Sequence, residues 1–319
     1  MKIKTLDALK LPEGVRLPYF GGKIYTLLSK AERKAIAKLP TEGLSLNTQA
    51  RAETITVSLT SFPARIETVG YAIKSLFHQT VKPDRIVLWL AEEQFKNRAL
   101  PPLLTTLCEC GLEIRFCAGD LRSHKKYFYT LQAQKENELV ITYDDDLIFP
   151  EDSIERLYRM HQEYPNCIIC NRGQVAVGDE NGFAPYGRWQ VHSPVGVGEP
   201  VSCVFPSTGG GTLYPFGAVH QDAFSVSVMQ ENAFTADDLW IRFMSARKGT
   251  KVVKTRKNHR TFTTVEGSQT ESLQAVNCLE GENDRVLARL SRLYPEAVSE
   301  ILGVDWNEKP EHHYTGIQG

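Results

Sequence analysis

Three consecutive aspartates, Asp144, Asp145 and Asp146, follow the apolar segment 138–143 and precede the apolar residues 147–149. Carboxylates this close together repel one another, and beside buried apolar neighbours their ionised forms are costly unless a positive charge lies among them. A hard cation such as Mg²⁺ or Mn²⁺ suits all-oxygen ligands and keeps open positions that a diphosphate can fill. The alternative is a solvated acidic turn where a strand meets a loop. The apolar residues after the aspartates favour the metal site.

A second acidic pair, Asp237 and Asp238, stands near the start of a helical pattern in residues 233–249. Two interpretations are open. Thr235 is a suitable N-cap, and acidic residues in a first helical turn complement the helix macrodipole, so the pair can serve the helix alone. Alternatively, one carboxylate of the pair faces a hydroxyl group and removes its proton.

Glycines and cations supply further candidate ligand-binding residues. Residues 209–211 are three consecutive glycines, which permit close backbone approach to a ligand, although a flexible loop has the same composition. Lys125 and Lys126 either offset the charge of a diphosphate or are solvated. The segment 254–260 is rich in cations and includes His259.

Strand-like and helical segments alternate from residue 53 onwards and must position these residues. Short apolar or β-branched runs predict strands, and runs with apolar residues at helical spacing predict helices. The alternation predicts a mostly parallel α/β sheet flanked by helices, whose ligands gather at the carboxyl ends of the strands. The predicted strands cover residues 54–60, 85–90, 112–117, 138–143 and 167–173, and the predicted helices cover residues 65–79, 127–137, 153–165, 233–249 and 282–295. Residues 173–217 lack a regular pattern and suggest a functional loop.

The composition limits the class of protein. A chain of 319 residues with 42% hydrophobic and 24% charged residues is globular, and its net charge of −1 gives no general attraction to nucleic acid. The odd number of irregularly spaced cysteines does not indicate a disulfide framework, and Cys167 and Cys170 are expected to be core residues. This use of cysteine fits a reducing cytoplasm. No signal-peptide core or apolar run of about 20 residues is found, so any membrane association is expected to be peripheral. The basic residues 30–40 form either a solvated helix face or a helix that docks on a membrane or partner.

Three features, in this order, resemble the GT-A fold glycosyltransferases, the nucleotide-sugar-dependent class with a metal-binding D-x-D motif. Residues 57–90 look like the opening strand, first helix and second strand of that class. YDDDLIF (143–149) looks like its metal motif, and TADDLWIRF (235–243) looks like its late acidic helix start. The likeness runs from residue 54 to residue 260. It is nearest to bacterial transferases of capsule and surface-glycan loci and more distant to the exostosin-like enzymes.

The resemblance implies how the sugar donor and the metal would be bound. Asp144 would contact the sugar or ribose and also serve as a metal ligand, and Asp146 would bind the metal directly. Because side chains alternate along an extended strand, Asp144 and Asp146 are expected to share a face, which leaves Asp145 pointing elsewhere with a less defined donor-side role. His259 would be a third metal ligand or an exposed bystander. The remaining donor-binding residues implied by the resemblance are Thr60, Ser61, Phe62, Arg65, Lys126, Gly210 and Gly211.

The resemblance also implies a function. The chain would be a metal-dependent glycosyltransferase that uses Mn²⁺ or Mg²⁺ to move a sugar from a nucleotide-diphosphate donor, with a UDP-sugar as first choice. The acceptor would be a hydroxyl of a surface polysaccharide, capsule or glycolipid. Asp238 is the better match to the general base of inverting relatives, with Asp237 beside it, whereas the matching acid of exostosin-like retaining relatives has a less settled role.

The expected domains are an N-terminal extension (1–52), a GT-A domain (53–260) and a C-terminal helical extension (261–319), with a flexible acceptor-side loop at 173–217. Phe183, Tyr186 and Trp189 in that loop are expected to stack on sugar faces as it closes over ligand. The expected location is the cytoplasm, either free or as a peripheral protein at the inner face of the cell membrane. The sequence does not indicate an oligomeric state.

Two other functions stay open. A nucleotidyltransferase acting on sugar phosphates shares an α/β nucleotide fold and an acidic metal site. Such enzymes normally have a Gly-rich basic loop after the first strand, and LTSFPARIE (59–67) contains no glycine. A catalytically silent glycan-binding or assembly protein could keep the same sheet and acidic cluster.

Overall fold

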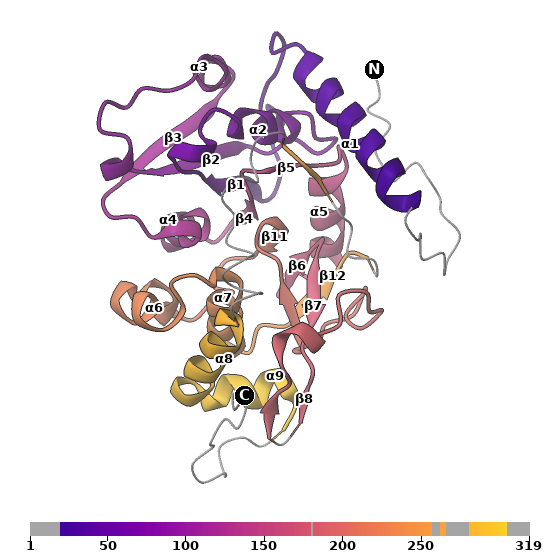
Figure 1. The fold of residues 1–319 in the computed structure, drawn as a ribbon, viewed down its shortest axis with the longest axis vertical. Coiled ribbons are helices and arrows are strands. Elements are labelled where there is room, and N and C mark those ends of the chain that lie inside the picture. The colour runs from indigo at the N-terminus through magenta and orange to yellow at the C-terminus, as the bar shows by residue number, and fades with distance from the viewer. Residues whose placement is uncertain (1–19, 180, 257–261, 266–280, 305–319) are drawn as a thin grey trace.

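A seven-stranded sheet organises the computed structural model, which describes residues 20–179, 181–256, 262–265 and 281–304, with only the backbone of residues 20–28. The strand order is β12-β6-β11-β4-β1-β2-β3, and every pairing is parallel except the two made by β11 (Figure 1). The strands are β1 (Thr54–Thr60), β2 (Arg85–Ala91), β3 (Leu112–Cys117), β4 (Glu138–Tyr143), β6 (Ile168–Cys170), β11 (Gly210–Tyr214) and β12 (Val252–Lys254). This arrangement confirms the predicted fold class and is consistent with a Rossmann-like GT-A sheet.

Helices cover both faces of the sheet, which explains why polar as well as apolar strand residues are buried. On β1, Ile55, Val57 and Leu59 enter one hydrophobic cluster, while the hydroxyl of Ser58 on the opposite face contacts that of Thr130 at 2.7 Å. The first face carries α2 (Val69–Phe77), α3 (Pro102–Glu109) and α5 (Ser153–Glu163). The second cluster contains residues of α4 (Lys125–Gln132), α6 (Val226–Ala233), α7 (Asp237–Arg247), α8 (Glu282–Leu293) and α9 (Pro295–Leu302).

Shorter elements complete the described chain. The helix α1 (Phe20–Lys38) packs against α2 and β13, and β13 (Thr263–Thr264) pairs with β5 (Leu147–Ile148) directly after the three aspartates. The 3-10 segments are η2 (Pro63–Arg65), η3 (Glu92–Gln94), η4 (Arg122–His124), η5 (Tyr186–Arg188) and η6 (Gln221–Phe224).

Residues 173–217 contain more regular structure than the sequence indicates. They form β7 (Gly173–Val175), β8 (Gly178–Asp179), β9 (Gly182–Phe183), β10 (Val204–Pro206) and β11, an interior strand of the seven-stranded sheet. Phe183 and Trp189 are buried and pack around Phe205, with ring centroids 6.1 and 4.6 Å from it. The expected role of these two rings in stacking on sugars is therefore wrong, because their faces already lie in the core.

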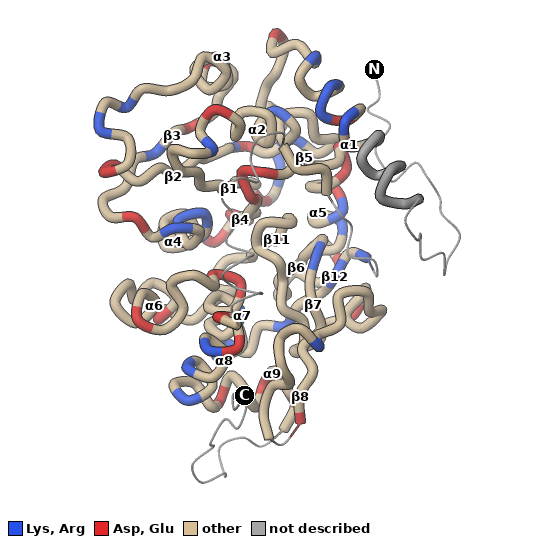
Figure 2. Tube along the Cα trace, in the orientation of Figure 1, with Lys and Arg blue, Asp and Glu red and all other residues tan. Residues whose placement is uncertain are grey.

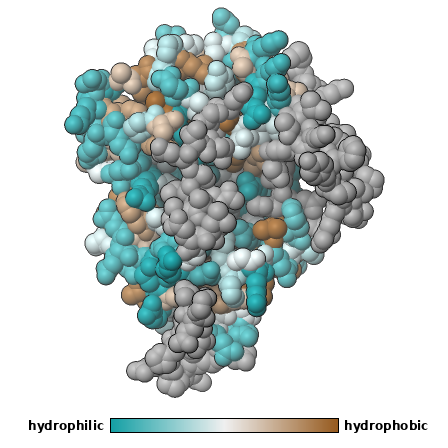
Figure 3. Space-filling view, viewed as in Figure 1, coloured by the Kyte–Doolittle hydropathy of each residue, from teal (hydrophilic) through white to brown (hydrophobic). Residues whose placement is uncertain are grey.

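The surface of the described chain is mostly hydrophilic in the view of Figure 3, with separate small hydrophobic patches. None of the described helices combines the length and apolar character needed to cross a bilayer. Cys167 and Cys170 are free and buried, as expected for core residues.

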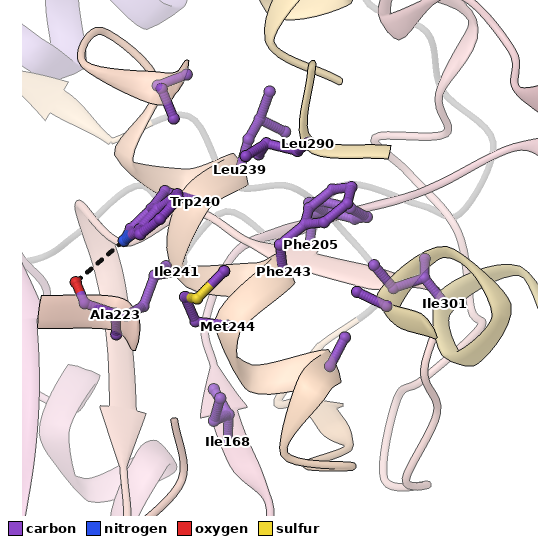
Figure 4. Close-up of a cluster of buried hydrophobic side chains, with 14 of the residues drawn as sticks. Ile168, Phe205, Ala223, Leu239, Trp240, Ile241, Phe243, Met244, Leu290 and Ile301 are labelled. Atoms are coloured by element: carbon purple, nitrogen blue, oxygen red, sulfur yellow. Dashed lines mark hydrogen bonds between the residues drawn. The ribbon is translucent and has the colours of Figure 1, made fainter. Parts of the chain in front are cut away.

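The helix α7 connects the hydrophobic core to the second acidic pair. Trp240 is fully buried, and its indole nitrogen donates to the carbonyl of Ala223 at 3.1 Å (Figure 4). Phe243 and Met244 from the next turn are also fully buried in the same cluster. The acidic start of α7 is therefore held in place by the packing of its later turns.

We expect Trp240→Ala to lower the free energy of unfolding by about 3–5 kcal/mol, because it leaves a cavity and an unpaired carbonyl. Urea unfolding measures this loss. Leu293→Ala, at a side chain with 47% exposure in α8, is the control and should change stability by less than about 0.5 kcal/mol. Similar losses for the two variants would contradict the central packing of α7.

Candidate active site

The three aspartates lie at the carboxyl end of β4, which stops one residue before Asp144. Asp144 accepts a hydrogen bond from the Lys126 ammonium at 2.7 Å. Asp145 and Asp146 instead contact one guanidinium nitrogen of Arg65, at 2.7 and 3.0 Å. Because the extended backbone has ended, the expected alternation of these side chains is wrong, and neighbouring aspartates share one cation.

Asp145 joins the loop after β1 to the end of β4. One of its oxygens accepts from the Ser61 hydroxyl at 2.6 Å and the other from Arg65. Burial raises the pKa of Asp145, although Arg65 and Ser61 oppose that shift. The ring of Phe62 lies 5.4 Å from the Arg65 guanidinium, and the Thr60 hydroxyl donates to a β2 carbonyl at 2.8 Å. Of the predicted nucleotide-binding residues here, Ser61 and Arg65 therefore contact the first acidic motif, whereas the Thr60 hydroxyl is bonded to β2.

Lys126 connects the first acidic motif with the second. Its side chain is 4% exposed, and its ammonium lies 2.7 Å from Asp144 Oδ1 and 2.9 Å from Asp237 Oδ2. Burial alone would lower the pKa of Lys126, but Asp144, Asp237 and Asp238 raise it well above the ordinary value. Acidic segments lie beside the β1, β4 and α7 labels in the middle of Figure 2. Lys126 thus holds carboxylates from residues 144 and 237 at one point.

Asp237 and Asp238 form the first turn of α7, and the N-cap residue is Ala236, without a side-chain cap. The suggestion that Thr235 is the N-cap is therefore wrong. Both carboxylates turn towards Thr208, whose hydroxyl lies 2.7 Å from Asp237 Oδ2 and 2.6 Å from Asp238 Oδ1. The Thr208 amide also donates to Asp238 Oδ1 at 2.8 Å. The pair contacts residues far away in the sequence as well as beginning a helix.

The two carboxylates of this pair have opposite pKa shifts. Burial would raise the pKa of Asp237, but Lys126 and His124 hold it below the ordinary value. Burial and the neighbouring charge of Asp237 raise the pKa of Asp238 to about 6. Asp238 forms no ion pair with the Lys, Arg and His residues that the structure describes, whereas Asp237 is paired. A carboxylate that titrates near neutral pH is suited to accept a proton.

The turn between β10 and β11 explains the glycine run. The Thr208 carbonyl accepts from the Thr142 hydroxyl at 2.7 Å, and the Gly209 carbonyl accepts from the Asp144 amide at 3.1 Å. A Cβ on Gly209 would lie 1.6 Å from Asp144 Oδ2, so no other residue fits without moving that carboxylate. Gly210 similarly gives room to a neighbouring side chain, and Gly211 adopts φ of +93°.

Two residues at this site were missed by the sequence reasoning. Arg172 follows β6 at the same edge of the sheet, packs its methylene groups against Gly210, and lies with its guanidinium 5.4 Å from the Phe262 ring. Burial lowers the pKa of Arg172, while Asp144, Asp238 and Asp146 oppose that shift. Thr208 is the second. The sequence shows that Thr208 directly precedes the three glycines, but its contacts with α7 depend on the tertiary fold.

The carboxylate oxygens of the site are the ligand type that a hard cation prefers, and they could fill some of its coordination positions. The Asp144 side chain is 39% exposed and that of Asp146 is 14% exposed, so oxygen ligands reach the surface of the site. Among the described residues, no three or more His, Cys, Asp or Glu side chains form a complete metal cage. Mg²⁺ is commonly held by one or two carboxylates together with substrate phosphates. Asp144 and Asp146 would hold the cation in that way.

The predicted basic segment is only partly described. His259 and residues 257–261 in general lie outside the described residues. Lys254 is buried and donates to the Ser193 carbonyl at 2.7 Å, so it supports the fold around β12.

Comparison with known proteins found no family model that matches the chain and no curated protein with a similar sequence. A solved structure of mannosyltransferase PcManGT from Pyrobaculum calidifontis, in complex with GDP-Man and Mn²⁺, has a TM-score of 0.45 and 13% identity over 88% of this chain and 77% of its own. A 4-diphosphocytidyl-2C-methyl-D-erythritol synthase from Anaerococcus prevotii DSM 20548 has a TM-score of 0.39 and 14% identity, covering 76% of this chain and 99% of its own. A second structure of a synthase with that name has a TM-score of 0.40 and 9% identity, covering 68% of this chain and 96% of its own. Similarity this low does not assign a function, which has to rest on the geometry of the site.

We expect Gly209→Ala to weaken binding of UDP or GDP in the presence of Mn²⁺ by at least about tenfold, or ~1.4 kcal/mol. The added Cβ would overlap the Asp144 carboxylate and force it away from Lys126. Isothermal titration calorimetry measures the affinity. Gly187→Ala is the matched control, since a Cβ there meets no atom within 4 Å. Equal affinities in both variants would show that Asp144 does not take part in binding.

Proposed function

We propose that this chain is a metal-dependent glycosyltransferase that moves a sugar from a nucleotide-diphosphate donor to a hydroxyl of a polysaccharide, capsule or glycolipid acceptor. The supporting observation is the Lys126 bridge, 2.7 Å from Asp144 and 2.9 Å from Asp237. It unites an acidic motif suited to a diphosphate-bound cation with a carboxylate pair suited to proton removal. A transferase needs both groups at one place.

The first acidic motif would serve the sugar donor. Bound Mn²⁺ or Mg²⁺ would neutralise the charge that develops on the leaving diphosphate. Asp144 and Asp146 would hold that cation, while Asp145 keeps Arg65 and Ser61 in place through bonds of 2.7 and 2.6 Å. Lys126 and Arg65 neutralise part of the acidic charge, which lowers the repulsion between these carboxylates and a diphosphate.

The second acidic pair would serve the acceptor. Asp238 is partly exposed and has no ion-pair partner among the described residues, whereas Asp237 is buried and held by Lys126. Asp238 would take the proton from the acceptor hydroxyl. The oxygen of that hydroxyl would bond to the sugar carbon as the nucleoside diphosphate departs. Asp237 would keep its charge and hold Lys126 in position. The pair therefore has two different tasks.

The direct test incubates the protein and Mn²⁺ with a panel of nucleotide sugars and measures release of nucleoside diphosphate. A glycosyltransferase releases the diphosphate from its own sugar donor, slowly to water and faster to a fitting acceptor, and EDTA stops the release. A parallel reaction with nucleoside triphosphates and sugar phosphates measures pyrophosphate. Pyrophosphate release alone would assign nucleotidyl transfer, and no turnover in either reaction would assign a binding protein.

We expect Asp238→Asn to lower turnover at least ~100-fold with little loss of stability. Asparagine keeps an oxygen for the Thr208 donors but cannot accept the proton. Because the folded-state pKa of Asp238 is raised, its ionisation opposes folding at neutral pH, so the variant should unfold at the same temperature as wild type or slightly above. The wild-type rate should rise with pH through about 6 as Asp238 ionises.

Asp237→Asn is the matched control. It removes a carboxylate from buried Lys126, so we expect a clear loss of thermal stability while much of the turnover is kept. Full turnover in Asp238→Asn, or a dead but stable Asp237→Asn, would contradict the assignment within the pair.

A further inference from the structure

Thr208 is a fully buried residue that touches both members of the second acidic pair. Its amide fixes Asp238 Oδ1 at 2.8 Å, and its hydroxyl lies 2.6 Å from the same atom and 2.7 Å from Asp237 Oδ2. The Thr142 hydroxyl holds the Thr208 carbonyl at 2.7 Å, so the turn itself is anchored to β4. Both donors reach one oxygen of Asp238. The other oxygen, Oδ2, has no hydrogen-bond partner among the described residues.

A threonine hydroxyl has one proton and so donates to one carboxylate at a time. When both aspartates are ionised, the Thr208 hydroxyl stabilises more charge by donating to Asp238 than to Asp237, because Asp237 already pairs with the Lys126 ammonium. Once Asp238 is protonated it is neutral, and a hydrogen bond from the Thr208 hydroxyl stabilises it less. The same hydroxyl can then turn its proton to Asp237 by rotation about one bond.

We propose that Thr208 is a positioning residue for the acceptor reaction: it holds Asp238 Oδ1 so that Oδ2 faces the acceptor, and its hydroxyl turns to Asp237 when Asp238 takes up the acceptor proton. The proton removed from the acceptor ends on Asp238 Oδ2, and no other covalent bond of the protein changes. This inference rests on the proposed glycosyl transfer and adds a residue to it.

Charged and titratable groups from several elements face Asp238. Asp237 belongs to the same helix and raises its pKa, whereas Lys126 from α4 lowers it. Among the described residues, the other groups that interact electrostatically with Asp238 are Arg172 after β6, Cys170 in β6 and Tyr214 in β11. A substitution at Thr208 leaves all of these groups in the chain. Loss of the Thr208 hydroxyl removes a bond that favours the ionised form of Asp238, so the pKa of Asp238 must rise.

The test compares Thr208→Val with Thr208→Ser by the pH dependence of kcat/KM for nucleotide-sugar turnover with Mn²⁺. In Thr208→Val we expect the ascending limb to move upward by about one pH unit, because a hydrogen bond to a charged group is lost. We also expect kcat to fall about tenfold with KM for the sugar donor unchanged, since the change affects a proton-transfer step. Thr208→Ser, which keeps the hydroxyl, should restore both the limb and kcat.

Thr212→Val is the matched control. Thr212 is also fully buried, and its hydroxyl donates to the Ser207 carbonyl at 3.0 Å without touching either aspartate. Thr212→Val should be less stable than wild type, but the ascending limb of its pH dependence of kcat/KM should stay at the wild-type position. If Thr208→Val does not fold, the comparison of Thr208→Ala with Thr208→Ser gives the same readout. An unmoved pH limb in the folded variant, or no rescue by serine, would overturn the proposal.

Asp238→Asn separates this inference from the proposed function. If Asp238→Asn is inactive and the Thr208 variant keeps the wild-type limb, Thr208 has only a structural role, and the proposed function stands. If Asp238→Asn turns over normally, Asp238 is not the base, and the role given to Thr208 fails with it.

Discussion

One buried ammonium group, that of Lys126, holds together two acidic segments that lie more than ninety residues apart in the sequence. A charge with 4% side-chain exposure is costly to bury unless it is paired, and removing one partner of a buried pair commonly costs about 3–5 kcal/mol. The carboxylates of Asp144 and Asp237 both pair with the Lys126 ammonium. The end of β4 and the start of α7 are therefore fixed relative to each other by electrostatics as well as by packing.

The cations around the site divide five aspartates into three kinds. Arg65 holds Asp145 and Asp146 against the loop after β1, and Lys126 holds Asp144 and Asp237. Among the residues that the structure describes, Asp238 accepts hydrogen bonds only from the hydroxyl and amide of Thr208. Within the second acidic pair, this difference in pairing contributes to the opposite pKa shifts of Asp237, which is lowered, and Asp238, which is raised.

Local sequence patterns predicted much of the fold and less of the site. The strand 54–60 and the buried Cys167–Cys170 segment follow from alternation and apolarity, which are local properties. The turn of Thr208 towards α7 depends on contacts across about thirty residues of sequence, and no local pattern encodes it. Composition could not tell whether Trp189 covers a ligand or the core. Thr235 was a reasonable N-cap by residue type, but the helix starts one residue later than that role requires.

A double-mutant cycle of Asp144→Asn and Asp237→Asn measures directly whether Lys126 couples the two acidic segments into one site. Either carboxylate alone can still neutralise Lys126, so the double variant should lose more unfolding free energy than the two single losses together, by ~1–3 kcal/mol. In a Lys126→Met background the excess should vanish. Single losses that add to within about 0.5 kcal/mol with Lys126 present would contradict the account.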